Sequence, residues 1–297
     1  MINSLLKIID ETRITKNADM SKYTTFRTGG CADIMVTPFS KEELKDVIKF
    51  FHEAKVGYYV LGNGSNILVS DNGLRKPVIN IGKALSDIGV FENYITASSG
   101  ASLASVAKKA LDCSLTGFEF AAGIPGTVGG AMIMNAGAYG GEMKYVTEAV
   151  SYIDSSGEEH IASNDEMEFS YRHSALSETD CIITGATFML GYGDKQEIAD
   201  KMSLLAKKRR EKQPLEFPSA GSTFKRPEGN FAGMLIEKSG LKGKTSGGAQ
   251  VSEKHAGFII NKGGATSNDI LQLIEIVRDT VYKDSGVLLE PEVKYWE

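Results

Sequence analysis

The stretch Ala121–Gly141 could hold a ligand with its backbone, because twelve of its twenty-one residues are glycine or alanine and none is charged. Residues without bulky side chains let amide N–H groups approach a ligand closely and adopt positive φ, so successive amides can converge on an anion such as a pyrophosphate. The glycine spacing matches neither the Rossmann G-x-G-x-x-G turn nor a P-loop. We interpret the stretch as a cofactor cradle of another kind; a packing interface of small residues is the alternative.

A second glycine loop lies earlier in the chain, between the apolar runs 58–61 and 67–69. Its sequence, GNGSN, again offers closely spaced amides with little side-chain bulk. An Asn-Gly pair is also the standard signal of a two-residue hairpin turn. The sequence alone leaves both interpretations open, a second cradle or a bare turn.

Three single side chains could act on a bound substrate. Ser222 lies in the polar segment FPSAGSTFKRPEGN, close to cationic side chains. It lacks the G-x-S-x-G pattern of a nucleophile elbow, so a proton donor is the better functional interpretation, and a turn serine that caps a backbone group is the alternative. Arg172 and Glu292 are ambiguous when taken singly, since a surface ion pair is the commonest fate of both residue types.

The histidines and cysteines do not form a recognisable metal or disulfide pattern. The four histidines are scattered without metal-ligand spacing, and the three cysteines are far apart and odd in number. We therefore expect no metal site, no disulfide framework and a reducing cytoplasm. Cys31 is interpreted as a small apolar filler beside Gly29 and Gly30, with a redox role as the weaker alternative. Neither glycine loop contains histidine or cysteine, which predicts a cofactor held without a covalent bond.

Composition excludes several other classes of protein. The chain has 297 residues, enough for two or three domains, and a net charge of −5, which argues against a dedicated nucleic-acid or acidic-membrane binder. No segment approaches eighteen consecutive apolar residues, and the N-terminus lacks a signal-peptide cleavage pattern. We expect a cytoplasmic protein with no nucleic-acid, membrane or protein partner implied.

Hydrophobic periodicity predicts a mixture of strands and helices. A helix is expected over 2–13, and Ser40 with Glu43 predicts a capping box for a helix over 42–54. Helix 195–210 ends in KKRR, which suits the helix dipole, and is interpreted as a hinge into a last domain. The other expected helices cover 102–111, 231–238 and 268–283, and the expected strands cover 32–37, 58–61, 67–69, 78–81, 94–97, a hairpin of 150–154 with 159–161, 181–190, 256–261 and 287–295.

Six motifs, taken together, closely resemble those of the UDP-N-acetylenolpyruvoylglucosamine reductases, the MurB family. They are GNGSN, GIPGTVGGAMIMNAGAYGG, FSYR, AGSTFKRP, AGMLIEKSGLKGKTSGGAQVSEKHAGFIIN and LLEPEV, in that order, and the resemblance runs from about Thr24 to Tyr295. It implies an α+β fold, with a two-lobed FAD-binding unit of the vanillyl-alcohol-oxidase type and a smaller α/β substrate-binding domain. The expected boundaries are 1–82 for lobe 1, joined by the C-terminal strand 291–297, 83–208 for lobe 2, and 209–290 for the substrate domain.

The resemblance also implies the reaction. NADPH would reduce a non-covalent FAD, which would pass a hydride to the enolpyruvyl methylene carbon of the UDP-sugar to give UDP-N-acetylmuramate for peptidoglycan synthesis. The two glycine loops would then hold the flavin. Their expected cofactor-binding residues are Gly62, Asn63, Gly64, Ser65, Asn66, Gly123, Ile124, Pro125, Gly126, Thr127, Gly129, Gly130, Ala131, Asn135 and Gly137.

The resemblance assigns roles to the polar side chains as well. Arg172 and Glu292 would stabilise charge that develops on the substrate carboxylate, and Ser222 would donate the proton that completes the reduction. The expected substrate-binding cations are Arg209, Lys212 and Lys225.

One part of the family pattern is missing. Some members insert a tyrosine-bearing loop after the flavin domain; here 190–197 passes directly into the hinge helix, as in a shorter subtype. The rival functions are a flavin oxidase of the same fold, which would consume molecular oxygen, and a non-catalytic nucleotide-sugar or flavin-binding module. The three polar residues assigned to the reaction argue against the second.

Overall fold

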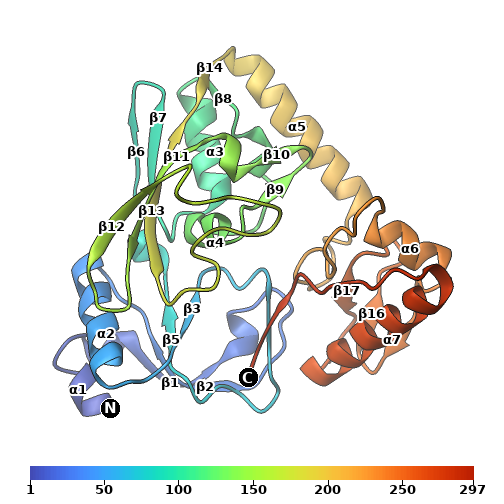
Figure 1. Cartoon of the computed structure of the whole chain (residues 1–297), viewed down its shortest axis with the longest axis horizontal. Coiled ribbons are helices and arrows are strands. Elements are labelled where there is room, and N and C mark those ends of the chain that lie inside the picture. Colours follow the sequence, from blue (N-terminus) through green and yellow to red (C-terminus); the bar gives the residue numbers. More distant parts are fainter. The chain divides into compact units, whose positions relative to one another are not determined.

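The computed structural model describes residues 1–82 and 84–297 and mixes helices with short strands (Figure 1). The chain forms two compact units, each assembled from separate stretches. Unit 1 comprises residues 1–15, 35–62 and 76–208, and unit 2 comprises 16–34, 63–75 and 209–297. The three-part division expected from the sequence stays a prediction.

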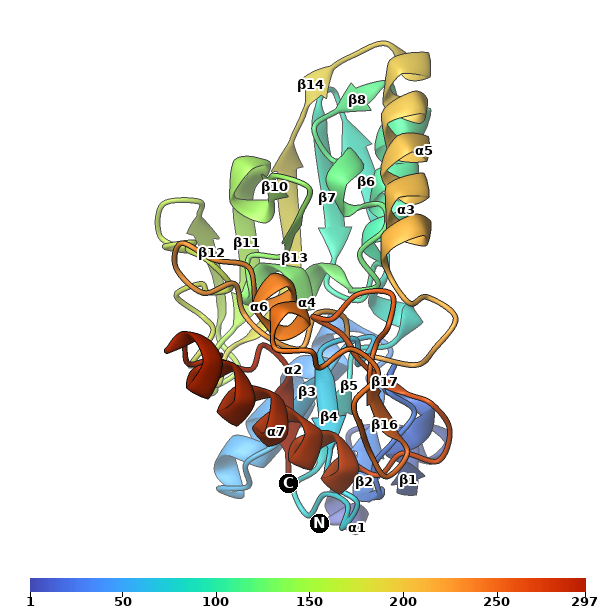
Figure 2. The ribbon, with the colours of Figure 1, turned by 90° about the vertical axis from the view of Figure 1, so that its right-hand side faces the viewer.

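An antiparallel sheet in the order β12-β11-β13-β7-β6 forms the framework of unit 1. Its strands are β6 (Ile88–Phe91), β7 (Tyr94–Ser98), β11 (Thr147–Ile153), β12 (Glu159–Ser163) and β13 (Ile182–Met189). Strands β11 and β12 are the predicted hairpin, with Val150 opposite Ala162. Helices α3 (Leu103–Asp112) and α4 (Val128–Ile133) contact this sheet, and Figure 2 shows α3 beside β6 and β7.

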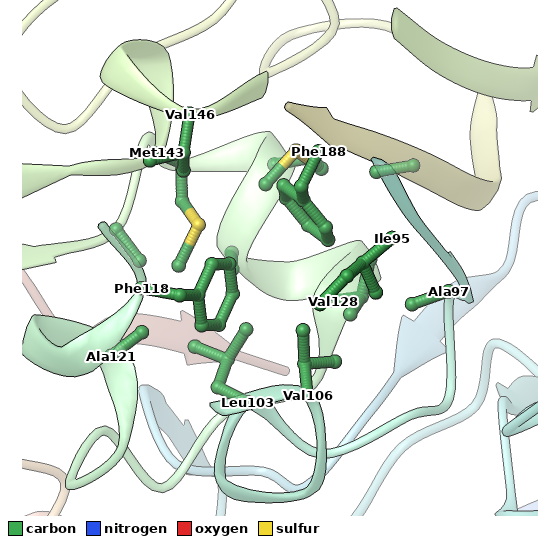
Figure 3. Close-up of a cluster of buried hydrophobic side chains, with 14 of the residues drawn as sticks. Ile95, Ala97, Leu103, Val106, Phe118, Ala121, Val128, Met143, Val146 and Phe188 are labelled. Carbon is green, nitrogen blue, oxygen red and sulfur yellow. The ribbon is translucent and has the colours of Figure 1, made fainter. Parts of the chain in front are cut away.

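The core of unit 1 fills the space between these helices and the sheet. Phe118 and Phe188 meet edge to face with ring centroids 4.9 Å apart, and Figure 3 shows Leu103 and Val106 of α3 pointing toward Phe118. All four side chains are fully buried or nearly so, and Val106 points toward Val128 as well (Figure 3). Burial of an aromatic or branched side chain of this size contributes about 1.5–3 kcal/mol, so this cluster fixes α3 and the loops around it against the sheet.

The other elements belong to unit 1 or are divided between the two units. Helix α5 (Lys195–Lys212) starts in unit 1 and ends in unit 2. Strands β1 (Ile14–Asp19), β2 (Cys31–Val36), β5 (Val78–Asn80) and β3 (Tyr59–Leu61) form a sheet in that order. The remaining elements are α1 (Ile2–Leu5), η1 (Glu11–Arg13), α2 (Lys41–Glu53), η3 (Lys83–Leu85), β8 (Leu115–Thr116), η4 (Glu119–Ala121), β9 (Gly137–Ala138), β10 (Gly141–Glu142), η5 (Met143–Tyr145) and β14 (Gly191–Tyr192).

Unit 2 is built around helix α7 (Ser267–Ser285), which packs on the short sheet β15-β16-β17. Its buried face is the predicted one, Ile270, Leu273, Ile274 and Val277. The α7 N-terminus has a complete capping box between Thr266 and Asp269. The other elements are η2 (Met20–Lys22), β4 (Ile67–Val69), α6 (Ala232–Lys238), β15 (Thr245–Ser246), β16 (Ala249–Val251), β17 (Ile259–Asn261) and β18 (Lys294–Trp296), the last pairing in parallel with β4.

Three local predictions were wrong in extent or detail. The helix expected over 2–13 ends at Leu5 and is followed by a short 3₁₀ turn. The capping box at Ser40 is only half formed, because the Glu43 carboxylate accepts from the Phe39 N–H at 2.7 Å instead of from the Ser40 N–H. The last strand covers only Lys294–Trp296, because the segment before it pairs with residues 223–225 through a single antiparallel bridge between Phe224 and Pro291.

Candidate functional site

The loop Gly62–Asn66 does not close a hairpin. It connects β3, which pairs with β5, to β4, which pairs with β18. The bare-turn interpretation is therefore wrong. The loop instead connects two different sheets, and Gly62 and Gly64 each pack closely against a different neighbour.

Gly64 and Gly62 are glycines for steric reasons. Gly64 has φ +59°, its carbonyl accepts from the Thr25 N–H at 3.1 Å, and a Cβ there would lie 2.1 Å from the Tyr23 carbonyl oxygen. A Cβ on Gly62 would lie 2.5 Å from Thr127 Oγ1, so Gly62 is packed directly against the second glycine loop. Any side chain at either position displaces backbone or a buried neighbour.

Several glycines of the Ala121–Gly141 cradle serve close packing rather than positive φ. Gly129, Gly130 and Gly137 lie outside the left-handed region, which corrects the sequence expectation. A Cβ on Gly129 would lie 3.0 Å from Ser99 Cβ, and one on Gly137 would lie 2.7 Å from the Gly141 carbonyl oxygen. The loop is thus held close to its neighbours by its lack of side chains.

The amides of the two loops divide into two groups. Those of Val128 and Gly129 are used inside the protein, since they donate to Ala101 and Ser99 at 2.9 Å each and dock the start of α4 on that segment. Among the residues that the structure describes, no protein group accepts from the backbone N–H of Gly64, Ser65, Asn66, Gly126, Thr127 or Gly130. Closely spaced amides in loops of small residues fit the recognition of a diphosphate, so these residues fit FAD.

Two buried hydroxyls next to these loops were missed by the sequence analysis. Ser99 Oγ, beside Gly129, and Thr28 Oγ1 have no hydrogen-bond partner although both residues are almost fully buried. Thr28 belongs to the 24–28 segment, in which Thr25 bonds to Gly64. A buried hydroxyl without a partner costs free energy, and it marks a place where a ligand could supply the missing bond. The sequence around a single serine or threonine does not show whether its hydroxyl is buried without a hydrogen-bond partner.

Arg172 lies at the tip of a tight turn in unit 1. Ser170 and His173 exchange backbone hydrogen bonds of 3.1 and 3.3 Å around Tyr171 and Arg172. Arg172 has φ +55°, a conformation that costs a non-glycine residue about 1–2 kcal/mol. Its guanidinium donates to the Gly137 carbonyl at 3.3 Å, which joins this turn to the glycine-rich cradle. Strain of this kind is typical of functional positions.

Ser222 and Glu292 lie in two neighbouring segments of unit 2 that are hydrogen-bonded to each other. The Glu292 N–H donates to the Thr223 carbonyl at 2.8 Å, and the Thr223 N–H donates to the Gly257 carbonyl at 2.8 Å. The segment that carries Ser222 is therefore bonded on both sides. The Ser222 hydroxyl donates to the Phe224 carbonyl at 3.3 Å, and its residue is half-buried.

His255, which the sequence analysis left without a role, lies near Ser222. A Cβ on Gly257 would be 3.2 Å from His255 Nδ1 and 3.4 Å from Ser222 Oγ, so both groups face the same small space. Burial lowers the pKa of His255, with the charges of Lys242 and Lys212 acting in the same direction. Its Nδ1 accepts from the Gly257 N–H at 3.2 Å. The ring is therefore neutral near pH 7.

The three expected substrate cations have different surroundings. Arg209 Nε donates to Gln213 Oε1 at 2.9 Å on the same helix. Lys225 forms an ion pair of 3.2 Å with the exposed Glu290. Lys212 is exposed at the end of α5, and its charge acts on His255. The structure thus places Lys212 and Lys225, like Ser222 and Glu292, in unit 2.

The described residues form no metal site and no membrane-spanning helix. No group of three or more histidine, cysteine, aspartate or glutamate side chains there could hold a metal ion. In the same part of the chain, no helix combines the length and the apolar character that a membrane crossing needs. The three cysteines are free thiols.

Family models match both parts of the chain. The FAD binding domain matches residues 32–163, and the C-terminal domain of UDP-N-acetylenolpyruvoylglucosamine reductase matches residues 213–296. The second range holds Ser222, Lys225 and Glu292.

Full-length relatives carry the same name. The chain is 49% identical over 294 residues to UDP-N-acetylenolpyruvoylglucosamine reductase of Caldanaerobacter subterraneus subsp. tengcongensis, covering 99% of this chain and 97% of that protein. It is 48% identical over 291 residues to the protein of that name from Clostridioides difficile, covering 98% and 96%.

Solved structures agree on the fold. The crystal structure of UDP-N-acetylenolpyruvylglucosamine reductase (MurB) from Thermus caldophilus matches with a TM-score of 0.82 and 34% identity, over 96% of this chain and 98% of that one. A glucose oxidase variant of Phl p 4 matches with a TM-score of 0.51 and 13% identity over 65% of this chain and 44% of that one, a likeness of fold alone. The α+β fold with a flavin-binding unit of the vanillyl-alcohol-oxidase type is thus confirmed, and the chain belongs to the UDP-N-acetylenolpyruvoylglucosamine reductase family.

Proposed function

We propose that this chain reduces UDP-N-acetylenolpyruvoylglucosamine to UDP-N-acetylmuramate, with FAD as its cofactor and NADPH as the electron donor, in peptidoglycan precursor synthesis. The observation that carries the proposal is the 49% identity to a named reductase over 99% of the chain. Because the substrates are a UDP-sugar and NADPH, we place the reaction in the cytoplasm. No nucleic-acid, membrane or protein partner is needed for it.

The two glycine loops would hold the cofactor. Bound there, FAD would supply the redox chemistry of the reaction, the transfer of a hydride from NADPH to the enolpyruvyl carbon of the substrate. The amides of Gly64, Ser65, Asn66, Gly126, Thr127 and Gly130 are the strongest candidates for its diphosphate, because no group among the described residues accepts from them. Of the other loop residues named in the sequence analysis, Asn135 would only shape its loop, since its carboxamide bonds to other parts of unit 1. The rest would shape the loops or contact the remainder of the cofactor: Gly62, Asn63, Gly123, Ile124, Pro125, Gly129, Ala131 and Gly137.

Arg172 and Glu292 would act on the substrate carboxylate. Addition of a hydride to the terminal carbon of a carboxyvinyl ether moves negative charge onto the carboxylate, so a guanidinium aimed there lowers the barrier. Glu292 helps only if it is protonated or if it holds the guanidinium in place. The strained backbone at Arg172 supports a functional demand on that side chain.

Ser222 would supply the proton to the neighbouring carbon. An ordinary serine is a poor acid, but the carbon that carries the enolic charge is a strong base, which makes the transfer feasible. The 3.3 Å hydrogen bond from Ser222 to Phe224 is at the long end of the normal range, so the hydroxyl can leave it at little cost. Arg209, Lys212 and Lys225 would bind anionic groups of the substrate, with Lys225 exchanging its surface partner Glu290 for the ligand.

Anaerobic half-reactions test the function directly. The purified protein should be yellow, NADPH should bleach it, and UDP-N-acetylenolpyruvoylglucosamine should restore the oxidised spectrum with formation of UDP-N-acetylmuramate. Air-saturated buffer without the UDP-sugar is the comparison. If oxygen re-oxidises the reduced flavin rapidly and the UDP-sugar does not, the protein is an oxidase of the same fold. If NADPH does not reduce the flavin at all, the protein is a binding module.

A further inference from the structure

Asn135 lies completely buried behind the Arg172 turn, directly after α4. Its backbone has φ +42°, a left-handed conformation that asparagine adopts more readily than most residues. The sequence analysis placed Asn135 with the cofactor residues because it lies within the glycine-rich stretch. Its side chain in the structure has a different set of partners.

The Asn135 side-chain amide connects its own loop to two other segments of unit 1. Its Nδ2 donates to the Ser170 carbonyl at 2.9 Å and to Glu142 Oε2 at 3.0 Å, and its Oδ1 accepts from the Lys144 N–H at 3.0 Å. Both N–H groups and the oxygen are thus used inside the protein. A side chain with one carboxamide is the smallest that provides two donors and an acceptor at once.

The bond to Ser170 matters for Arg172 because Ser170 is the first residue of its turn. The Ser170 carbonyl also accepts from the His173 N–H, which closes the turn around Tyr171 and Arg172. On the other side of the same loop, the Arg172 guanidinium donates to Gly137, two residues after Asn135. Asn135 therefore holds the base of the turn, and the loop that carries Asn135 also carries the carbonyl that receives the arginine.

The rest of the turn is anchored to the end of α4 in the same way. Ser174 and Ser177 donate their hydroxyls to the Ile133 carbonyl at 2.9 and 2.6 Å. These bonds hold the segment after the turn, whereas Asn135 holds its start. Arg172 lies between the two anchors, in a conformation that its own backbone disfavours, so it needs support from outside the turn.

We propose that Asn135 is a positioning residue for Arg172: its carboxamide holds the Ser170–His173 turn so that the guanidinium meets the substrate carboxylate. This inference rests on the role of Arg172 in the proposed function. It assigns to the Asn135 side chain support of the substrate-reduction step, and no part in reduction of the flavin by NADPH.

Asn135→Gly tests the proposal, because glycine tolerates φ +42° while the whole side chain, with its carboxamide, is removed. Asn164→Ala is the matched control. Asn164 donates to the Lys144 and Thr147 carbonyls at 2.8 and 2.6 Å, in the same unit and next to the same η5 segment, but it does not touch the Arg172 turn. Stopped-flow absorbance measures the two half-reactions of each variant.

We expect Asn135→Gly to slow re-oxidation by the UDP-sugar about 10–100-fold, as misplacement of a catalytic group by an ångström does, and to leave reduction by NADPH within about twofold. Asn164→Ala should leave both steps within about twofold. In the background Arg172→Ala, adding Asn135→Gly should slow re-oxidation less than about twofold further, because a residue that acts through Arg172 has nothing left to position. Equal slowing of both steps, or full additivity with Arg172→Ala, would overturn the proposal.

A crystal structure of Asn135→Gly decides the matter independently of the reaction. The Arg172 guanidinium should lie beyond hydrogen-bond distance of the Gly137 carbonyl, or the Ser170–His173 turn should open. An unchanged turn would overturn the positioning role even if the reaction is as proposed. If wild-type protein is not re-oxidised by the UDP-sugar, the proposed function fails instead. If Asn135→Gly does not fold, Asn135→Ser, which keeps a small polar side chain, takes its place in both measurements.

Discussion

Replacement of Ser222 by alanine separates a catalytic serine from one that only caps a turn. The stability effect follows from the structure: the Ser222 hydroxyl makes one hydrogen bond, 3.3 Å long, to the Phe224 carbonyl two residues away. A half-buried bond of that length contributes about 0.5–1 kcal/mol at most. The backbone bonds of Thr223 to Gly257 and Glu292 do not involve the side chain, so the fold of the segment should be kept.

The expected kinetic effect is much larger. General acid catalysis typically contributes about 10²–10⁴-fold, which corresponds to about 2.7–5.5 kcal/mol of barrier. Loss of the proton donor should therefore slow re-oxidation of reduced flavin by the UDP-sugar by at least about a hundredfold. Reduction by NADPH needs no proton from Ser222 and should stay at the wild-type rate.

Stopped-flow absorbance of both half-reactions, with thermal unfolding of the same samples, distinguishes the outcomes. Ser246→Ala is the control, since Ser246 Oγ also makes one hydrogen bond, to Gln272 at 3.1 Å in the same unit. Ser222→Cys should recover part of the lost rate, because a thiol is a better acid than a hydroxyl. If Ser222→Ala slows re-oxidation less than tenfold, or slows both steps alike, the serine is structural and another group supplies the proton.

Three further outcomes test the cofactor loops and unit 1. Acid should release all of the flavin, identified as FAD by chromatography; colour that stays with the denatured protein would contradict a non-covalent site. Gly64→Ala should abolish flavin uptake or unfold the protein, because its Cβ would meet the Tyr23 carbonyl at 2.1 Å, whereas Gly140→Ala, at φ +87° with open space around it, should lose only about 1–2 kcal/mol. Glu119 is buried, and burial raises its pKa, but the hydrogen bonds from Thr116 and Lys201 lower the pKa by more, so the net shift is downward. The stabilisation that this carboxylate gives the fold is therefore present above its unfolded pKa near 4.5 and is lost as the pH falls through the lower folded value. Chemical denaturation should therefore show the stability difference between wild type and Glu119→Gln shrinking below about pH 4.5, and a pH-independent difference would refute it.

Local patterns in the sequence predicted the elements well where one face of the element is buried. The apolar face of α7 and the β11–β12 hairpin are where periodicity and turn residues place them. Element ends were harder to predict, because they depend on contacts with distant residues. The Glu43 carboxylate is the example: a capping box predicts a bond to Ser40, but Arg13 and the Phe39 N–H compete for that carboxylate.

The candidate site was predictable only where a motif marks it. The glycines in GNGSN predicted a loop with no room for side chains, and a Cβ on Gly64 would indeed collide with the Tyr23 carbonyl. Ser99 and His255 had no such signal, since a buried hydroxyl without a partner and a histidine next to Ser222 arise from the packing of segments far apart in the chain. The sequence could not separate amides that face a ligand from those that bond to Ser99 and Ala101 either.

Arg172 and Asn135 show how the hydrogen-bond partners of a side chain distinguish a residue that supports the fold from a residue that acts on the substrate. Both have positive φ without being glycine, so both positions cost the fold free energy that a glycine would avoid. The hydrogen bonds of the Asn135 side chain inside unit 1 offset part of this unfavourable free energy, since each stabilises the fold by about 0.5–1.5 kcal/mol. Arg172 donates a 3.3 Å bond to Gly137 and stacks its guanidinium 5.1 Å from the Tyr171 ring centre, among other interactions. Replacement by glycine removes these contacts but also relieves the positive φ, which is worth about 1–2 kcal/mol. Re-oxidation by the UDP-sugar should therefore fail in a variant that still folds at the assay temperature; a variant that is unfolded there would mean that the arginine is kept for the fold.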